Sequence, residues 1–118
     1  MTSNMKRRGS QYEAAFVTQA LKRGLDILEP YGDYMPYDVM VQNADGRIQR
    51  IQVKGTNSPI KGKPGYKILA ASGNIKKVAL SPEKVDVLAA YVEPEDTWYL
   101  IPVVKLNGNM SVYLNPNT

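Results

Sequence analysis

PYDVMVQNADGRIQRIQVKG, residues 36–55, holds two alternating apolar and polar runs on either side of a turn. The runs at 37–42 and 47–54 are rich in β-branched residues and have the period of two that half-buried strands show. Between them, Ala44-Asp45-Gly46 has the composition of a three-residue hairpin loop, with Gly46 in the left-handed conformation. The stretch therefore predicts a pair of antiparallel strands.

The length of the loop decides which side chains meet, because directly opposed residues of an antiparallel pair share a face. A four-residue loop would oppose Asp38 to Ile51 and mix polar with apolar side chains on both faces. A three-residue loop opposes Asp38 to Gln52 instead. It also gathers four branched residues on the other face, namely Val39, Val41, Ile51 and Val53. We predict this second register, because it separates a core face from a polar one.

In that register the polar face has the makings of a metal site. Asp38 and Gln52 would have Cβ atoms about 5 Å apart, and Lys54 would project from the same face one pleat further along. A carboxylate and an amide oxygen at this spacing can bind one hard cation, each at about 2.1 Å for magnesium. The Lys54 amine would then stand beside the water that the cation activates. The open alternative is an ordinary exposed sheet face that happens to carry Asp38, Arg50, Gln52 and Lys54.

This pattern resembles the PD-(D/E)XK nuclease superfamily, in which an Asp is followed by a strand that ends in (D/E)-x-K. Here it reads PYD at 36–38 and QVK at 52–54. Glu13 falls on a predicted helix where many members carry a further acid, and residues 85–102 look like the late strand pair of the small endonucleases. The likeness is strongest to bacterial group I intron homing endonucleases and to Holliday-junction-resolvase-like enzymes. Gln52 stands where Asp or Glu is usual, a variant that favours the homing branch.

The resemblance implies an α/β (α+β) fold with a restriction-endonuclease-like core, in which an N-terminal helix packs on a central mixed β-sheet, as one domain over residues 1–118. It implies an endonuclease that uses Mg²⁺, with Mn²⁺ as a substitute, and leaves 5′ phosphates. The implied catalytic residues are Glu13, Asp38, Gln52 and Lys54. The implied metal ligands are Asp38, Gln52, the backbone carbonyl near Val53, and Glu13. Lys54 would orient or deprotonate the attacking water.

Three functions compete at this point. The first is a DNA endonuclease, either a homing enzyme or a Holliday junction resolvase, acting on double-stranded or branched DNA. The second is a catalytically inactive DNA-binding protein of the same fold, which Gln52 keeps open. The third is a small structural or interaction protein. Cutting two strands requires two active sites, so the first predicts a homodimer or homotetramer with the aromatic late strands as candidate interface.

Composition narrows the chemistry. The 118 residues include no cysteine and no histidine, which excludes zinc sites, disulfides, thiol nucleophiles and histidine bases. A formal charge of +4 and a pI near 9.3 suit a polyanionic partner. The sequence has no apolar run long enough for a membrane span and no apolar segment after the basic N-terminus, so we expect neither a span nor a signal peptide. A cytoplasmic location is the expectation.

The N-terminal part predicts a polar, frayed start over residues 1–9 and a helix over 10–24. Lys6, Arg7 and Arg8 either contact phosphates or form a solvated tail. Ser10 and Glu13 match a capping box, which gives Glu13 an explanation that needs no metal.

The remaining segments predict short strands joined by turns. Strands are expected at 25–28, 67–71, 85–92, 98–104 and 110–114, with Asp33 in a turn and only a short helix or turn over 72–83. The loop at 55–66 would follow the Lys54 strand, and it either offers Lys61 and Lys63 to phosphates or is a plain connector. The full set of candidate DNA contacts is Lys6, Arg7, Arg8, Arg50, Lys61 and Lys63.

Overall fold

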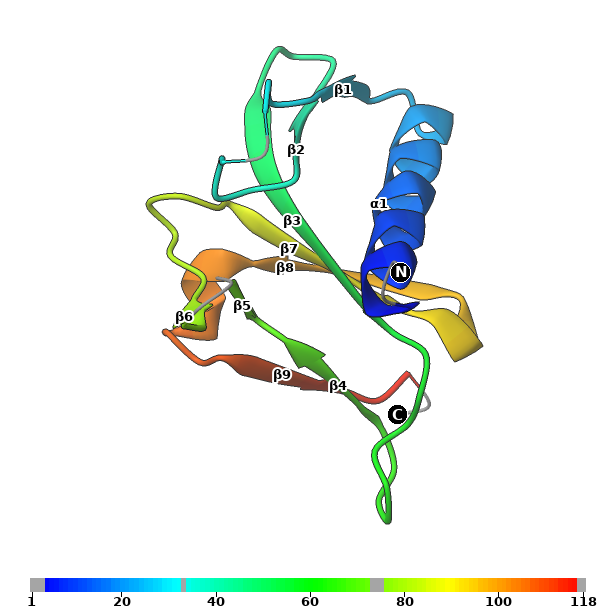
Figure 1. The fold of residues 1–118 in the computed structure, drawn as a ribbon. Coiled ribbons are helices and arrows are strands. Elements are labelled where there is room, and N and C mark those ends of the chain that lie inside the picture. Colours follow the sequence, from blue (N-terminus) through cyan, green and yellow to red (C-terminus); the bar gives the residue numbers. More distant parts are fainter. Residues whose placement is uncertain (1–3, 33, 73–75, 117–118) are drawn as a thin grey trace.

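The computed structural model describes residues 4–32, 34–72 and 76–116, so Asp33 lies outside the described residues. The fold has three layers (Figure 1): a single long helix, a central sheet, and an outer layer of short strands. Helix α1 spans Asn4–Lys22. Within the described residues, no helix is both long and apolar enough to cross a membrane.

The central sheet has five strands in the order β1-β2-β3-β7-β8. Their bounds are β1 Asp26–Leu28, β2 Val39–Gln42, β3 Ile48–Thr56, β7 Val87–Val92 and β8 Thr97–Pro102. β3 and β7 run parallel, whereas every other neighbouring pair is antiparallel. The expected fold, an N-terminal helix on a mixed sheet, is therefore confirmed.

The β2–β3 hairpin has the predicted register. Val39 is paired with Ile51, and Val41 with Gln49. The loop closes through the Asn43 N–H, which donates to the Arg47 carbonyl at 2.8 Å, and Gly46 has a φ of 87°. The loop is thus the three-residue one, and continuing its register by one residue places Asp38 opposite Gln52.

Helix α1 begins six residues earlier than the sequence predicts, since it starts at Asn4 rather than Ser10. Lys6, Arg7 and Arg8 therefore belong to the helix and not to a frayed start. Met, Lys and Arg are good helix formers, and Gly9 costs only about 1 kcal/mol relative to alanine. Ser10 lies inside the helix, so the expected capping box with Glu13 does not exist.

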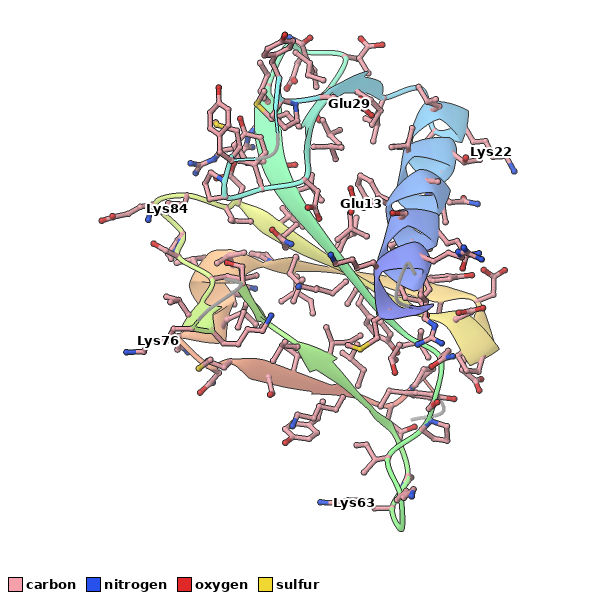
Figure 2. All side chains as sticks on the ribbon, viewed as in Figure 1. Glu13, Lys22, Glu29, Lys63, Lys76 and Lys84 are labelled. Atoms are coloured by element: carbon pink, nitrogen blue, oxygen red, sulfur yellow. The ribbon has the colours of Figure 1, made fainter. Side chains whose placement is uncertain are left out.

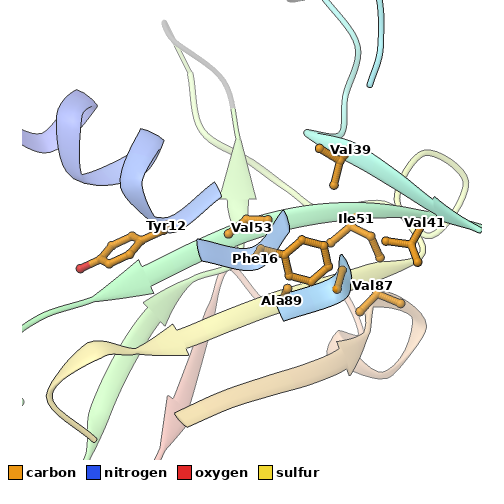
Figure 3. Packing of buried hydrophobic residues seen from close by; sticks show 9 residues of the cluster. Tyr12, Phe16, Val39, Val41, Ile51, Val53, Val87 and Ala89 are labelled. Carbon is orange, nitrogen blue, oxygen red and sulfur yellow. The ribbon is translucent and has the colours of Figure 1, made fainter. Parts of the chain in front are cut away.

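The first core lies between α1 and the sheet (Figure 3). Three helix residues, Tyr12, Phe16 and Ala20, are at most 8% exposed because they share one face of α1. The strands contribute Val39, Val41, Ile51, Val53, Val87 and Ala89. The face predicted as core from the hairpin register is therefore the face that α1 covers.

The outer layer covers the opposite face of the sheet. β4 (Tyr66–Leu69) pairs antiparallel with β9 (Ser111–Leu114), and β5 (Ala71–Ser72) with β6 (Val78–Ala79). The 3₁₀ helix η2 (Val103–Leu106) connects β8 to β9. A second core fills the space between, with Tyr37, Ile68, Ala70, Leu80, Val85, Leu88, Ala90, Val103 and Leu106. Strand β6 lies where the sequence predicted only a short helix or turn.

Three tyrosine hydroxyls bind the turn between β7 and β8, which contains the 3₁₀ helix η1 (Glu93–Glu95). The donor and acceptor pairs are Tyr12 to Glu93 at 2.8 Å, Tyr66 to Glu95 at 3.2 Å and Tyr91 to Asp96 at 2.6 Å. Burial and the Glu93 carboxylate raise the pKa of Tyr12 to about 12. Because the three rings come from α1, β4 and β7, one turn connects all three layers.

Candidate active site

Asp38 lies one residue before β2 and is held against β3 by two hydrogen bonds. Its backbone N–H donates to the Ile51 carbonyl at 2.9 Å, and its Oδ2 accepts the Val53 N–H at 2.8 Å. Burial raises the pKa of Asp38, whereas the Val53 amide and the Lys54 ammonium lower it. The carboxylate is therefore fixed beside the segment of β3 that carries Gln52 and Lys54.

Gln52 and Lys54 lie on the face of β3 that points away from α1, because side chains alternate along a strand. Gln52 is 9% exposed and is the one polar side chain classed as buried in the described part of the chain. Burial lowers the pKa of Lys54, and the nearby Lys77 ammonium lowers it further, whereas Asp38 and Glu13 raise it. A depressed pKa makes this amine easier to deprotonate than an exposed lysine.

Glu13 comes from the helix and is near enough to Asp38 and Lys54 for its carboxylate to interact electrostatically with both. It is half-buried on the side of α1 that faces the sheet (Figure 2). Burial raises its pKa most, and the Asp38 and Glu29 carboxylates raise it further, whereas Lys54 lowers it. Without a capping box at Ser10, the competing explanation for Glu13 is removed.

A depression of about 330 Å³ contains both carboxylates. Its lining consists of Glu13, Glu29, Pro30, Gly32, Met35, Tyr37, Asp38 and Val39. A larger groove of about 490 Å³ lies between α1 and strands β2, β3, β7 and β8, but no Asp or Glu of the described residues lines it. We place the candidate site at the smaller depression because acid–base and metal chemistry need carboxylates, although Gln52 and Lys54 are not among its lining residues.

The donor set fits a hard divalent cation. Glu13 and Asp38 are half-buried carboxylates that interact unfavourably with each other, and a cation between them would relieve that repulsion. Among the described residues, no three His, Cys, Asp or Glu side chains group as a metal site. A bound ion would therefore need neutral oxygens as well, and Gln52 offers one on the neighbouring strand.

A close approach between Gly55 and Tyr12 sets the spacing of the helix and β3. A Cβ built on Gly55 would overlap the Tyr12 ring at Cδ2 and Cε2. Gly55 follows Lys54 and Tyr12 precedes Glu13, so the contact brings two candidate site residues together. Only a residue without a side chain permits this approach.

Gly55→Ala should lower the free energy of unfolding by about 1–3 kcal/mol, because Tyr12 cannot move away without straining its bond to Glu93. Urea denaturation followed by circular dichroism measures the change. Gly9→Ala is the matched control: nothing lies within 4 Å of its Cβ position, and it should stabilise α1 by about 0.5–1 kcal/mol. Equal midpoints for the two variants would contradict the close approach.

Arg50 has a structural role that the sequence did not reveal. Its Nε and Nη2 donate to the two carboxylate oxygens of Asp86, both at 2.9 Å, and Nη1 donates to the Glu83 carbonyl at 2.7 Å. The Arg50 guanidinium lowers the pKa of Asp86. With most of its donors engaged inside the molecule, Arg50 clamps β3 to the start of β7, and its role as a DNA contact stays a prediction.

The other predicted contacts are distributed over two regions. Lys61 and Lys63 are exposed on the loop before β4, whereas Lys6 and Arg7 are exposed in the first turns of α1 and Arg8 is half-buried there. Sequence reasoning missed two neighbours of the site, Glu29 and Lys77. Lys77 belongs to a visible Lys-Lys pair, but nothing local to that pair indicates that the chain returns it to Lys54.

The chain is similar to known proteins in both sequence and structure. The model of a family described as PD-(D/E)XK endonuclease matches residues 3–117. Among solved structures, a bacterial homing endonuclease, I-Ssp6803I, matches with a TM-score of 0.79 and 26% sequence identity, over 95% of this chain and 78% of that one. No curated protein sequence matches. The family match includes every candidate site residue described above.

Proposed function

This chain belongs to the PD-(D/E)XK endonuclease family, and from that premise we propose that it is a metal-dependent DNA endonuclease of the homing type. The observation that carries the proposal is the hydrogen bond from the Val53 amide to the Asp38 carboxylate, 2.8 Å long. It joins the two halves of the family motif across neighbouring strands, beside the half-buried Lys54. The likeness to a bacterial homing endonuclease supports the role.

Nucleases of this family generally use divalent metal ions. We propose Mg²⁺, with Mn²⁺ as a substitute, held by Asp38, the Gln52 side chain, the Val53 carbonyl and Glu13. When bound, such an ion polarises the scissile phosphate and lowers the pKa of the attacking water. Gln52 contributes an oxygen without a negative charge, so the ion would be held less tightly than by two carboxylates.

Lys54 supplies what the metal ligands cannot. Its amine lies on the same face as Gln52, and its lowered pKa suits a group that orients or deprotonates the attacking water. In its charged form it offsets negative charge that develops on the phosphate in the transition state. Glu13 and Asp38 partly offset the cost of a positive charge at this position, since both raise the pKa of Lys54 against the lowering by burial and by Lys77.

The runner-up functions are a Holliday junction resolvase and a catalytically inactive DNA-binding protein. Gln52 favours the catalytically inactive DNA-binding protein, because the described residues contain no group of three acids at the site. The third function, a structural protein with no nucleic-acid role, does not account for the family match. Salt-dependent binding to DNA without nicking in Mg²⁺ or Mn²⁺ would favour the inactive DNA-binding protein.

We also propose that the active enzyme is a homodimer or homotetramer, since cutting both strands requires two sites. The aromatic late strands are a weaker interface than the sequence suggested. Trp98 stacks on Tyr91 with ring centroids 4.4 Å apart and meets Phe16 edge-on, so these rings pack within one chain. Leu100, 65% exposed on the edge strand β8, is the better candidate for a contact between chains.

The activity test uses supercoiled plasmid and the purified chain, fractionated by gel filtration. We expect the fractions of the protein peak to nick and linearise the plasmid in Mg²⁺ or Mn²⁺. The same fractions should not cleave it in EDTA. Sequencing the ends separates a defined duplex target, expected for a homing enzyme, from cleavage restricted to branched junctions. Absence of cleavage on plasmid libraries and on junctions in either metal would contradict the proposed function.

A further inference from the structure

The positive charge of the chain is concentrated in one layer. In the described residues 57–72, 76–82 and 103–116, which we call the outer layer, lie six of the fifteen Lys and Arg residues and none of the eleven Asp and Glu residues. The six are Lys61, Lys63, Lys67, Lys76, Lys77 and Lys105. The outer layer thus carries +6, and the rest of the chain carries −2 of the formal +4. All six lysines are exposed.

The outer layer also has an accessible face of its own. Along β4 the burial alternates, so Tyr66 and Ile68 are buried, Ile68 in the second core, and Lys67 points to solvent. Lys67 is paired directly with Tyr113 of β9, which is 66% exposed. The outward side of this two-stranded ribbon therefore presents a cation beside an aromatic hydroxyl. Lys63 lies beyond the end of the ribbon, on a loop that projects from the molecule (Figure 2).

The outer layer reaches the candidate active site at one point. Lys77, just before β6, is close enough to Lys54 for the two ammonium groups to interact. A polyanion that enters the site would therefore meet Lys77 of the outer layer as well as Lys54. Two-stranded ribbons have dimensions that the major groove of duplex DNA admits.

We infer that the outer layer is the DNA-binding surface, on which Lys61, Lys63 and Lys67 bind phosphates and the ribbon of β4 and β9 lies in a groove of the duplex. The inference rests on the proposed function and names the surface that delivers DNA to its site. It adds Lys67 to the candidate phosphate contacts. The basic N-terminal turns of α1 then have a secondary part in DNA binding, since α1 lies on the opposite side of the sheet from the outer layer (Figure 1).

Two triple variants with the same loss of charge test the inference. The first is Lys61→Ala with Lys63→Ala and Lys67→Ala, on the outer layer. The matched control is Lys22→Ala with Arg23→Ala and Arg47→Ala, at the end of α1 and the β2–β3 turn, far from the projecting loop (Figure 1). All six side chains are exposed, so both variants should fold. Affinity for a duplex is measured in EDTA as a function of salt concentration.

The outer-layer variant should bind duplex DNA at least about tenfold more weakly, and the slope of log affinity against log salt should fall by about 3. The control should keep the slope of the unmodified protein. Equal losses in both variants, while the unmodified protein still nicks DNA in Mg²⁺, would overturn the surface and leave the proposed function standing. No binding by the unmodified protein at low salt would overturn both.

Discussion

Asp38→Asn should reduce metal-dependent DNA cleavage by about 10³-fold or more, equivalent to about 4 kcal/mol of transition-state stabilisation. The substitution removes the charge that we propose holds the cation. It keeps the shape of the side chain and an oxygen that can still accept the Val53 amide proton. Initial rates of plasmid nicking at saturating DNA, over a range of Mg²⁺ and Mn²⁺ concentrations, measure the loss.

The same variant should not lose stability. Burial raises the pKa of Asp38 in the folded state, so its negative charge near pH 7 is less favourable in the fold than in the unfolded chain. Removing that charge should leave the urea midpoint unchanged or higher. Asp45→Asn, in the exposed turn of the same hairpin, is the control and should cleave normally. A folded Asp38→Asn protein that cleaves within tenfold of the unmodified rate would refute the metal site.

Lys54→Met should abolish cleavage to a similar extent through a different step. Methionine keeps the apolar part of the side chain but can neither orient or deprotonate water nor carry positive charge, so the rate at saturating metal should fall by about 10³-fold. Metal binding should survive in this variant, whereas it should be lost in Asp38→Asn. Titration of Mn²⁺ followed by calorimetry separates the two effects.

Lys54→Arg gives a further distinction. An arginine keeps the positive charge but does not release its proton in the accessible pH range. If Lys54 only offsets charge, the arginine variant should recover part of the rate, whereas a role in deprotonating water predicts no recovery. Lys22→Met, on the far end of α1, is the matched control and should retain full activity. Full activity of Lys54→Met would remove Lys54 from the mechanism.

The hairpin and its polar face could be predicted from local sequence because the alternation of apolar residues allows only one register. The four branched residues of β2 and β3 would be split between faces in the other register, and the structure confirms the choice. The three-residue loop and the left-handed Gly46 were predictable for similar local reasons, whereas the mixed sheet was expected from the family resemblance. The placement of Asp38 opposite Gln52 then follows from the register alone.

The features that sequence reasoning missed depend on contacts between distant segments. Arg50 has an exposed-face pattern, but its partner Asp86 lies 36 residues away. The pairing of β4 with β9 likewise joins segments far apart in the chain. The sequence therefore revealed neither the outer layer nor the proximity of Lys77 to Lys54. The start of α1 was misplaced because a basic run followed by Gly9 has the composition of a tail as well as of a helix.

The three tyrosines that bind the β7–β8 turn have a consequence for how the molecule opens. Peeling the β4–β9 ribbon off the sheet would break the Tyr66–Glu95 bond, and lifting the helix would break Tyr12–Glu93, at the same short turn. Fluctuations that begin at this end should therefore release all layers together. Amide protons of α1, β4 and β7 near the turn should exchange with solvent as one cooperative unit, with a common free energy of opening.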